Sequence, residues 1–222
     1  METEAMKPKL IVFASGTKTG GGSGFEVLVK SVEVGDLDAE IVAVVSNHEH
    51  GSVRERADRL GVPFIHFPGP WSAENYREIV RQSGTEWVAL SGWLKLVSGL
   101  DPRRTFNIHP GPVPEFGGKG MHGHHVHEAV MQAFHDGRIR ESAISMHFVT
   151  EEYDKGPVFF RCPIRILDTD TPDTLGARVN EAEHRWQPYI TDLVVHGKFG
   201  WNGTDLQSLW TPEDYSFKPR TQ

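Results

Sequence analysis

The chain has 222 residues, 38% of them hydrophobic and 24% charged, which is typical of a globular domain with a sizeable core. Its formal net charge of −7 argues against a general nucleic-acid binder, because phosphate contacts need clustered Lys and Arg side chains. Because the chain has no apolar run of roughly 20 residues, no signal-peptide pattern and a single cysteine, Cys162, we expect a cytoplasmic protein without membrane spans or internal disulfides.

Apolar runs and helical patterns alternate along the chain, as a parallel, doubly wound sheet requires. In chain order, we expect strands at residues 10–14, 41–46, 64–66, 87–91, 105–109, 143–149 and 157–163. Helices are expected at 25–30, at 52–60, from about 72, at 124–135, and from 172, where Thr171 is a suitable N-cap and Pro172 a suitable first residue. The pattern predicts an α/β fold, an open, mostly parallel twisted sheet with helices on both faces. No repeat or long linker interrupts it, so we expect one domain, 1–203, and a loosely attached C-terminal tail, 204–222.

A glycine-rich loop, residues 15–24, follows the first expected strand. Backbone amides of such a turn and the N-terminus of the next helix can bind an anion, with Ser23 donating and Lys18 assisting. The alternative is a flexible crossover loop without a ligand. Neither the dinucleotide fingerprint nor the Walker pattern is present, so the loop by itself leaves both interpretations open.

The fifth expected strand ends in Asn107 and His109, followed by Pro110. A spacing of two places both side chains on one face of a strand, at the carboxyl edge where open α/β sheets bind ligands. An amide can donate to a developing oxyanion, and an imidazole can move a proton near neutral pH. An Asn-x-His pair alone is more often just two polar residues. Asp154, in an acidic turn between two later strands, could orient His109 and raise its pKa, although the sequence does not show that they meet.

Five short pieces of sequence together carry a family resemblance. They are Phe106-Asn107-Ile108-His109-Pro110, Pro114, Gly117-Gly118, His147-Phe148-Val149-Thr150 and Asp154-Lys155-Gly156-Pro157. From about residue 9 to residue 199 the chain resembles the phosphoribosylglycinamide formyltransferases, members of the folate-dependent formyltransferase superfamily. The resemblance implies a Rossmann-like formyltransferase fold.

The resemblance also implies the chemistry and its residues. 10-Formyltetrahydrofolate would donate a formyl group to the amine of glycinamide ribonucleotide, without a metal. Asn107 would stabilise the tetrahedral oxyanion, His109 would shuttle protons, and Asp154 would hold His109 and a water in place. Orientation of two bound small molecules would lower the barrier.

Further residues match the family's substrate-binding positions. Those expected to bind the folate are Trp93, Leu94, Lys95, Leu96, Val149, Thr150 and Tyr153. Those expected to bind the phosphate and ribose of the ribonucleotide are Gly22, Ser23, Gly24 and Glu183. Read without the family, Leu90–Leu96 is a buried strand-to-helix turn and Glu183 a solvated helix position.

The chain departs from the family pattern most clearly near the acceptor. The glycine loop carries extra residues, 17–21, and has Gly24 where the family usually has Asn; Lys95 stands where many relatives have Arg; and the segments 110–114 and 115–121 differ from the commonest forms. The histidines His122, His124, His125 and His127 invite a zinc interpretation, but no convincing third ligand follows. We expect no metal, and His122 or His124 in the substrate pocket.

Three alternatives stay open beside transfer to the ribonucleotide. Two belong to the same superfamily, namely hydrolysis of 10-formyltetrahydrofolate and N-formylation of an amino-sugar nucleotide. The third is a non-catalytic folate- or nucleotide-binding protein, which would not require Asn107, His109 and Asp154 together. The sequence does not decide between a monomer and a homodimer.

Overall fold

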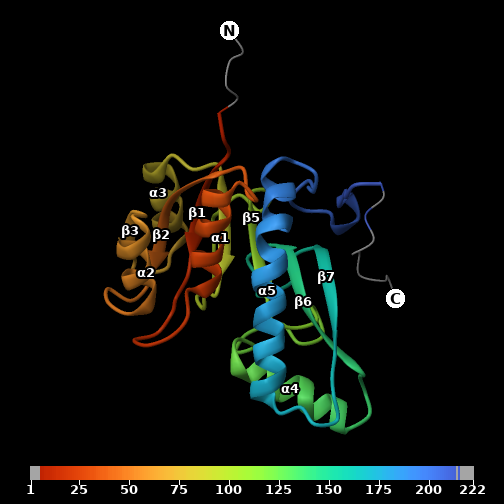
Figure 1. Ribbon diagram of the computed structural model, residues 1–222. Helices are drawn as coiled ribbons and strands as arrows, with labels where there is room; N and C mark the ends of the chain where they lie inside the picture. Colours follow the sequence, from red (N-terminus) through yellow and green to blue (C-terminus); the bar gives the residue numbers. More distant parts are fainter. Residues whose placement is uncertain (1–5, 214, 216–222) are drawn as a thin grey trace.

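A computed structural model describes residues 6–213 and residue 215 (Figure 1). Its strands are β1 (Lys9–Phe13), β2 (Glu40–Ser46), β3 (Phe64–His66), β4 (Trp87–Ser91), β5 (Thr105–His109), β6 (Glu141–Phe148) and β7 (Val158–Arg165). Its helices are α1 (Ser23–Val34), α2 (Ser52–Leu60), α3 (Ala73–Ser83), α4 (His124–His135), α5 (Pro172–Val195) and a short 3-10 turn, η1 (Leu206–Ser208). These elements match the expected order.

The strands form one sheet in the order β3-β2-β1-β4-β5-β6-β7. The pairs from β3 to β5 are parallel, whereas β6 is antiparallel to both β5 and β7. The expected open, mostly parallel sheet is therefore confirmed. Because β6 runs against β5, the loop after β6 begins beside Thr105, at the start of β5, and Asp154 in that loop reaches back to Asn107.

Helices cover both faces of the sheet, as expected. Side chains from α1, α2, α4 and α5 pack on one face in a large apolar cluster that includes Phe25, Val130 and Ile190. A smaller cluster on the other face joins Tyr76 of α3 to Phe13 and Trp93. In Figure 1, α1 and α5 run side by side, and these two helices are in direct contact.

Local chemistry explains where the helices begin and end. α5 starts with a capping box, in which the Thr171 hydroxyl accepts from the Thr174 amide while the Thr174 hydroxyl accepts from the Thr171 amide, so both orphan donors are satisfied. It continues through Pro188 to Val195. α1 begins at Ser23, two residues earlier than expected; its first hydrogen bond runs from the Glu26 amide to the Gly22 carbonyl, and Gly22 has a positive φ of 76° that glycine tolerates.

The C-terminal segment folds back onto the domain as far as the structure describes it. Gly200 pairs with Trp210 in an antiparallel bridge, and the Trp201 indole donates to the Pro102 carbonyl at 3.1 Å. The expected boundary at residue 203 stays a prediction, and residues 214 and 216–222 of the expected tail lie outside the described residues. No helix in the described part of the chain has the length and apolar character that crossing a membrane requires.

Candidate active site

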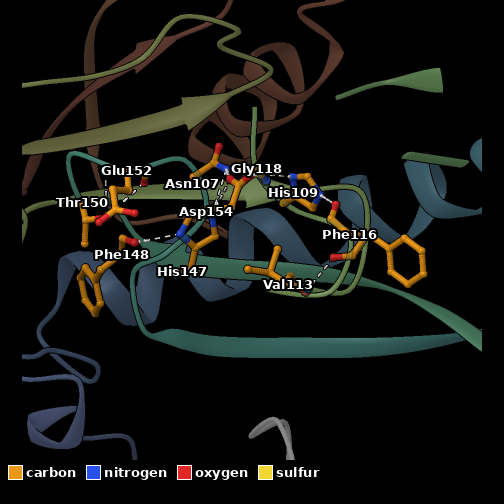
Figure 2. Close-up of polar contacts among 12 residues, drawn as sticks. Asn107, His109, Val113, Phe116, Gly118, His147, Phe148, Thr150, Glu152 and Asp154 are labelled. Carbon is orange, nitrogen blue, oxygen red and sulfur yellow. Dashed lines mark hydrogen bonds and ion pairs between the residues drawn. The ribbon is translucent and has the colours of Figure 1, made fainter. Parts of the chain in front are cut away.

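β5 presents Asn107 and His109 on the face opposite its core residues. Phe106 and Ile108 are buried in the apolar cluster beneath α1, α4 and α5, so strand alternation turns Asn107 and His109 the other way. Both then lie beside Asp154, which comes from the turn after β6 (Figure 2). The Asn107 amide nitrogen is 3.4 Å from Asp154 Oδ1, and His109 Nδ1 is 3.7 Å from Asp154 Oδ2. The structure therefore brings together the three residues predicted to carry the chemistry.

A strained turn and a glycine loop fix the position of Asp154. Among the described residues, Asp154 is the one non-glycine residue with positive φ (54°), a conformation that aspartate tolerates better than most residues. Its Oδ2 accepts the Gly118 amide at 2.8 Å, and a Cβ at Gly117 would lie 2.8 Å from Asp154 Cβ. The loop 115–121 therefore needs glycine at position 117 to close against the carboxylate.

The hydrogen bonds of His109 determine which nitrogen faces the reactants. Nε2 lies 2.8 Å from the Phe116 carbonyl, which can only accept, so Nε2 carries a hydrogen and Nδ1 is free in the neutral ring. Burial lowers the His109 pKa, although the charge of Asp154 and the Phe116 contact pull it upward. The predicted upward pull of Asp154 is thus present but is outweighed by desolvation. The neutral imidazole of His109 can therefore accept a proton at Nδ1, and the Asp154 carboxylate can stabilise the resulting imidazolium.

His147 on β6 is a fourth polar residue of the site, to which the sequence assigned no role. β6 is in register with β5 so that His147 stands opposite Asn107. Its Nδ1 donates to the Phe148 carbonyl at 2.8 Å, and its Nε2 lies 3.1 Å from the Asn107 amide nitrogen and 3.3 Å from Asp154 Oδ1. The histidines and the Gly118 amide hold the pKa of Asp154 below its usual value despite burial, so the carboxylate stays ionised.

Two cavities meet at these residues. One, of about 310 Å³, is lined by His109, the loop 118–122 and Leu94. The other is a narrow space of about 50 Å³ at the end of β4, which adjoins a further cavity of about 210 Å³. The residues shared by the first two are Trp93, Asn107, Tyr153 and Asp154. A reacting centre at Asn107 would therefore be accessible from two sides.

All the residues expected to bind the folate line these cavities. Trp93, Lys95, Leu96, Val149, Thr150 and Tyr153 line the narrow one, and Leu94 lines the larger one. Trp93 is mostly buried, and its indole donates to the Tyr76 hydroxyl at 3.0 Å. Lys95 lies over the Trp71 ring at 4.4 Å from its centroid. These contacts hold Trp93 and Lys95 in place in the walls of the cavities.

The glycine loop leads into α1 as expected, and Gly22, Ser23 and Gly24 form the start of that helix. Gly24 has no room for a side chain, because a Cβ there would collide with Ser91 Oγ and lie 2.8 Å from Gln187 Oε1. The buried Ser91 and Gln187 side chains are hydrogen-bonded to one another at 3.0 Å. The family's asparagine therefore cannot be accommodated here without other changes.

Glu183 lies on α5, near the start of α1 but outside the cavities around His109. It is half-buried, and its Oε2 accepts from the Asn180 amide at 3.4 Å. Desolvation raises the Glu183 pKa to about 7. Its neighbour His184 contacts Ser23, which places Glu183 on the same side of the site as the glycine loop.

The histidine cluster divides between the site and the surface. His122 lines the larger cavity, whereas His124 is exposed and pairs with Glu128 and Asp173. His125 is also exposed and pairs with Glu128, and His127 is buried on α4. Within residues 6–213 and 215, no three His, Cys, Asp or Glu side chains converge in a way that could hold a metal ion.

The chain is similar to known formyl transferases over most of its length. The family model described as formyl transferase matches residues 8–191 of the chain. The chain belongs to the formyl transferase family. It is 32% identical, over 96% of its length and 75% of the relative's, to the Arabidopsis thaliana protein named phosphoribosylglycinamide formyltransferase, chloroplastic. It is also 32% identical to the Bacillus subtilis phosphoribosylglycinamide formyltransferase, over 84% of this chain and 94% of that one.

A solved structure supports the same family and fold. Glycinamide ribonucleotide transformylase 1 from Symbiobacterium toebii superimposes with a TM-score of 0.76 at 26% identity, over 90% of this chain and 93% of that chain. Within this formyl transferase, the groups that sequence reasoning missed are His147, the Phe116 carbonyl, the Gly118 amide and His184. His147, the Gly118 amide and His184 each depend on a contact between segments far apart in sequence, so no local pattern indicates them. The Phe116 carbonyl is only seven residues from His109, but its contact depends on how the loop after β5 folds back. The position of His147 on a strand was the one sequence feature that could have pointed to it.

Proposed function

We propose that the protein transfers the formyl group of 10-formyltetrahydrofolate to the amine of glycinamide ribonucleotide, a step of purine biosynthesis. The observation that carries the proposal is the convergence of Asn107, His109 and Asp154 where two cavities meet. Relatives that match most of the chain carry names for this reaction. The narrow cavity and its extension suit the folate, and the larger one suits the ribonucleotide.

The residues suggest how the transfer proceeds. The acceptor amine attacks the formyl carbon, and a tetrahedral intermediate forms with an anionic oxygen. One hydrogen of the Asn107 amide is directed at His147 and Asp154, and the second is available to that oxyanion. His109 Nδ1 takes the proton that the amine loses, and Asp154 stabilises the imidazolium. The proton then passes to the folate nitrogen as the bond from the formyl carbon to that nitrogen breaks.

In this proposal, the largest contribution to catalysis comes from binding the amine and the formyl group next to one another. An oriented amine and formyl group react without the entropic penalty of a collision in solution. His109 is buried except where it lines the larger cavity, so a ribonucleotide that fills this cavity displaces water from the base, which favours transfer to the amine over hydrolysis. We further propose that the protein acts in the cytoplasm on small molecules alone, as a monomer or homodimer, and that no metal takes part.

An assay of formyl loss from 10-formyltetrahydrofolate, with and without glycinamide ribonucleotide, tests the proposal. We expect turnover to depend on the ribonucleotide and to give one formylated ribonucleotide for each formyl group lost. Equal turnover without it would identify a hydrolase, and transfer to an amino-sugar nucleotide alone would overturn the acceptor. An unchanged donor in every mixture would favour a binding protein.

The base is tested by His109→Ala, for which we expect kcat to fall by about 10²–10⁴ while the protein stays folded. His135→Ala is the matched control, because His135 is exposed at the end of α4. Near-normal activity of His109→Ala would show that another group moves the proton.

A further inference from the structure

A histidine from the last helix reaches the first residue of α1. His184 Nε2 lies 3.0 Å from the Ser23 hydroxyl, although the two residues are 161 positions apart in sequence. Both side chains are half-buried in the contact between α1 and α5. The mechanism proposed above uses neither the imidazole nor this hydrogen bond.

The surroundings of the Ser23 hydroxyl are those of an anion site. The Glu26 amide donates to the Gly22 carbonyl, so the amides of Ser23, Gly24 and Phe25 precede the first helical bond and have no acceptor within α1. Exposed amides at a helix N-terminus attract a phosphate group. Arg56 of α2 adds a cation, since its Nε donates to the Gly21 carbonyl at 3.3 Å.

We propose that His184 is a positioning residue of the acceptor site, and that it takes up a proton when a phosphate monoester binds at the start of α1. This inference rests on the proposed function only in assigning the acceptor's phosphate to this site. As an imidazolium, His184 donates its Nε2 hydrogen to Ser23 Oγ. The Ser23 hydroxyl hydrogen is then free to point at the phosphate. The positive charge of His184, in addition to that of Arg56, also attracts the anion.

The charges that face His184 determine when it is protonated. Burial and the nearby Arg56 lower the His184 pKa, so the imidazole is mainly neutral at pH 7 without ligand. Glu26 of α1 does little to offset Arg56, because it is also paired with Arg59 and Lys30. On α5 itself, Glu183 precedes His184, and burial raises the Glu183 pKa to about 7. A bound phosphate dianion reverses this balance and raises the His184 pKa in the complex.

Proton uptake by His184 distinguishes the proposed role from that of a hydrogen bond that only holds α1 and α5 together. A purely structural hydrogen bond needs a donor or acceptor at the ε position and nothing more. Glutamine places an amide there, so His184→Gln can keep the bond to Ser23 but cannot take up a proton. His184→Ala removes both the bond and the proton site.

The experiment is calorimetric titration of the wild type and the His184 variants with glycinamide ribonucleotide, at about pH 6.5. Two buffers of different ionisation enthalpy give the number of protons bound. We expect the wild type to take up on the order of half a proton more than His184→Gln. The phosphate's own ionisation, with a pKa of about 6, affects both proteins equally and cancels in the difference.

Affinity and turnover supply the second readout. We expect His184→Gln to bind the ribonucleotide about tenfold more weakly, equivalent to about 1.4 kcal/mol, with its kcat within about twofold of the wild type and its Tm unchanged. The affinity difference should shrink toward about pH 8, where the imidazole is neutral in both states. Equal proton uptake in the wild type and His184→Gln, or equal affinity across the pH range, would overturn the inference.

A titration with ribose 5-phosphate separates this inference from the proposed function. Binding of that phosphate monoester with His184-dependent proton uptake, in a protein that does not formylate glycinamide ribonucleotide, would preserve the inference and refute the function. Formyl transfer without such uptake would do the reverse. Absence of binding by both phosphorylated compounds would refute both.

Discussion

At the scale of single residues, Asp154 supplies the negative charge that faces both histidines of the site. It pairs with His147, lies near His109, and is anchored by the Gly118 amide. For Asp154→Asn we expect kcat to fall by on the order of 10²–10⁴, because the imidazolium of His109 loses its counter-charge. The same loss should lower the His109 pKa further, since Asp154 raises it in the wild type. The acidic limb of the kcat profile should therefore move to lower pH.

The measurement is kcat against pH for the variant and for Asp168→Asn. Asp168 is exposed in the turn before α5, so this control makes the same change of charge away from the site. An acidic limb that stays in place, with kcat close to that of the control, would mean that Asp154 does not act through His109.

At the scale of the elements, the contact between α1 and α5 leaves no room at Gly24. Alanine is usually better than glycine inside a helix by about 1 kcal/mol, but here its Cβ would meet Ser91 and Gln187. Overpacking a full site costs about 1–3 kcal/mol. We therefore expect Gly24→Ala to lower the free energy of unfolding, and to raise the KM for the ribonucleotide because the start of α1 is displaced.

Denaturant unfolding measures the effect, with two comparisons. Gly20→Ala is the matched control, since its Cβ would make only an ordinary contact, 3.5 Å from Thr17. Placing Gly24→Ala in a Ser91→Ala background removes the hydroxyl that collides and should recover part of the loss. No difference between the two backgrounds would contradict this packing argument.

The strands and loops around the site show which features the sequence could predict and which it could not. Continuous apolar runs identify the buried strands, and the spacing of Asn107 and His109 fixes their common face, because both patterns are local. The register of β6 against β5, which sets His147 opposite Asn107, follows from the whole sheet. The return of the loop 115–121 to Asp154, and the contact of His184 with Ser23, likewise depend on how distant segments pack.

At the scale of the whole molecule, the charge of Glu183 is expected to lower the stability of the fold while it helps to bind the acceptor. Its pKa is raised to about 7, so it favours the folded state at low pH, and that contribution is lost as the pH rises through about 7. Glu183→Gln removes the partly desolvated charge and keeps an oxygen that can accept from Asn180. We therefore expect the variant to exceed the wild type in Tm by about 2–4 °C at about pH 8, with little difference at about pH 5.

Thermal unfolding across this pH range measures the effect, with Glu181→Gln, an exposed position on the same helix, as the control. Because the family resemblance assigns Glu183 to the phosphate and ribose side of the acceptor, we expect the stabilised variant to bind glycinamide ribonucleotide more weakly. Such a trade is common where a binding group is held in unfavourable surroundings. A Tm difference that does not vary with pH would show that the Glu183 carboxylate is not destabilised by desolvation, and unchanged ribonucleotide affinity would remove Glu183 from the acceptor site.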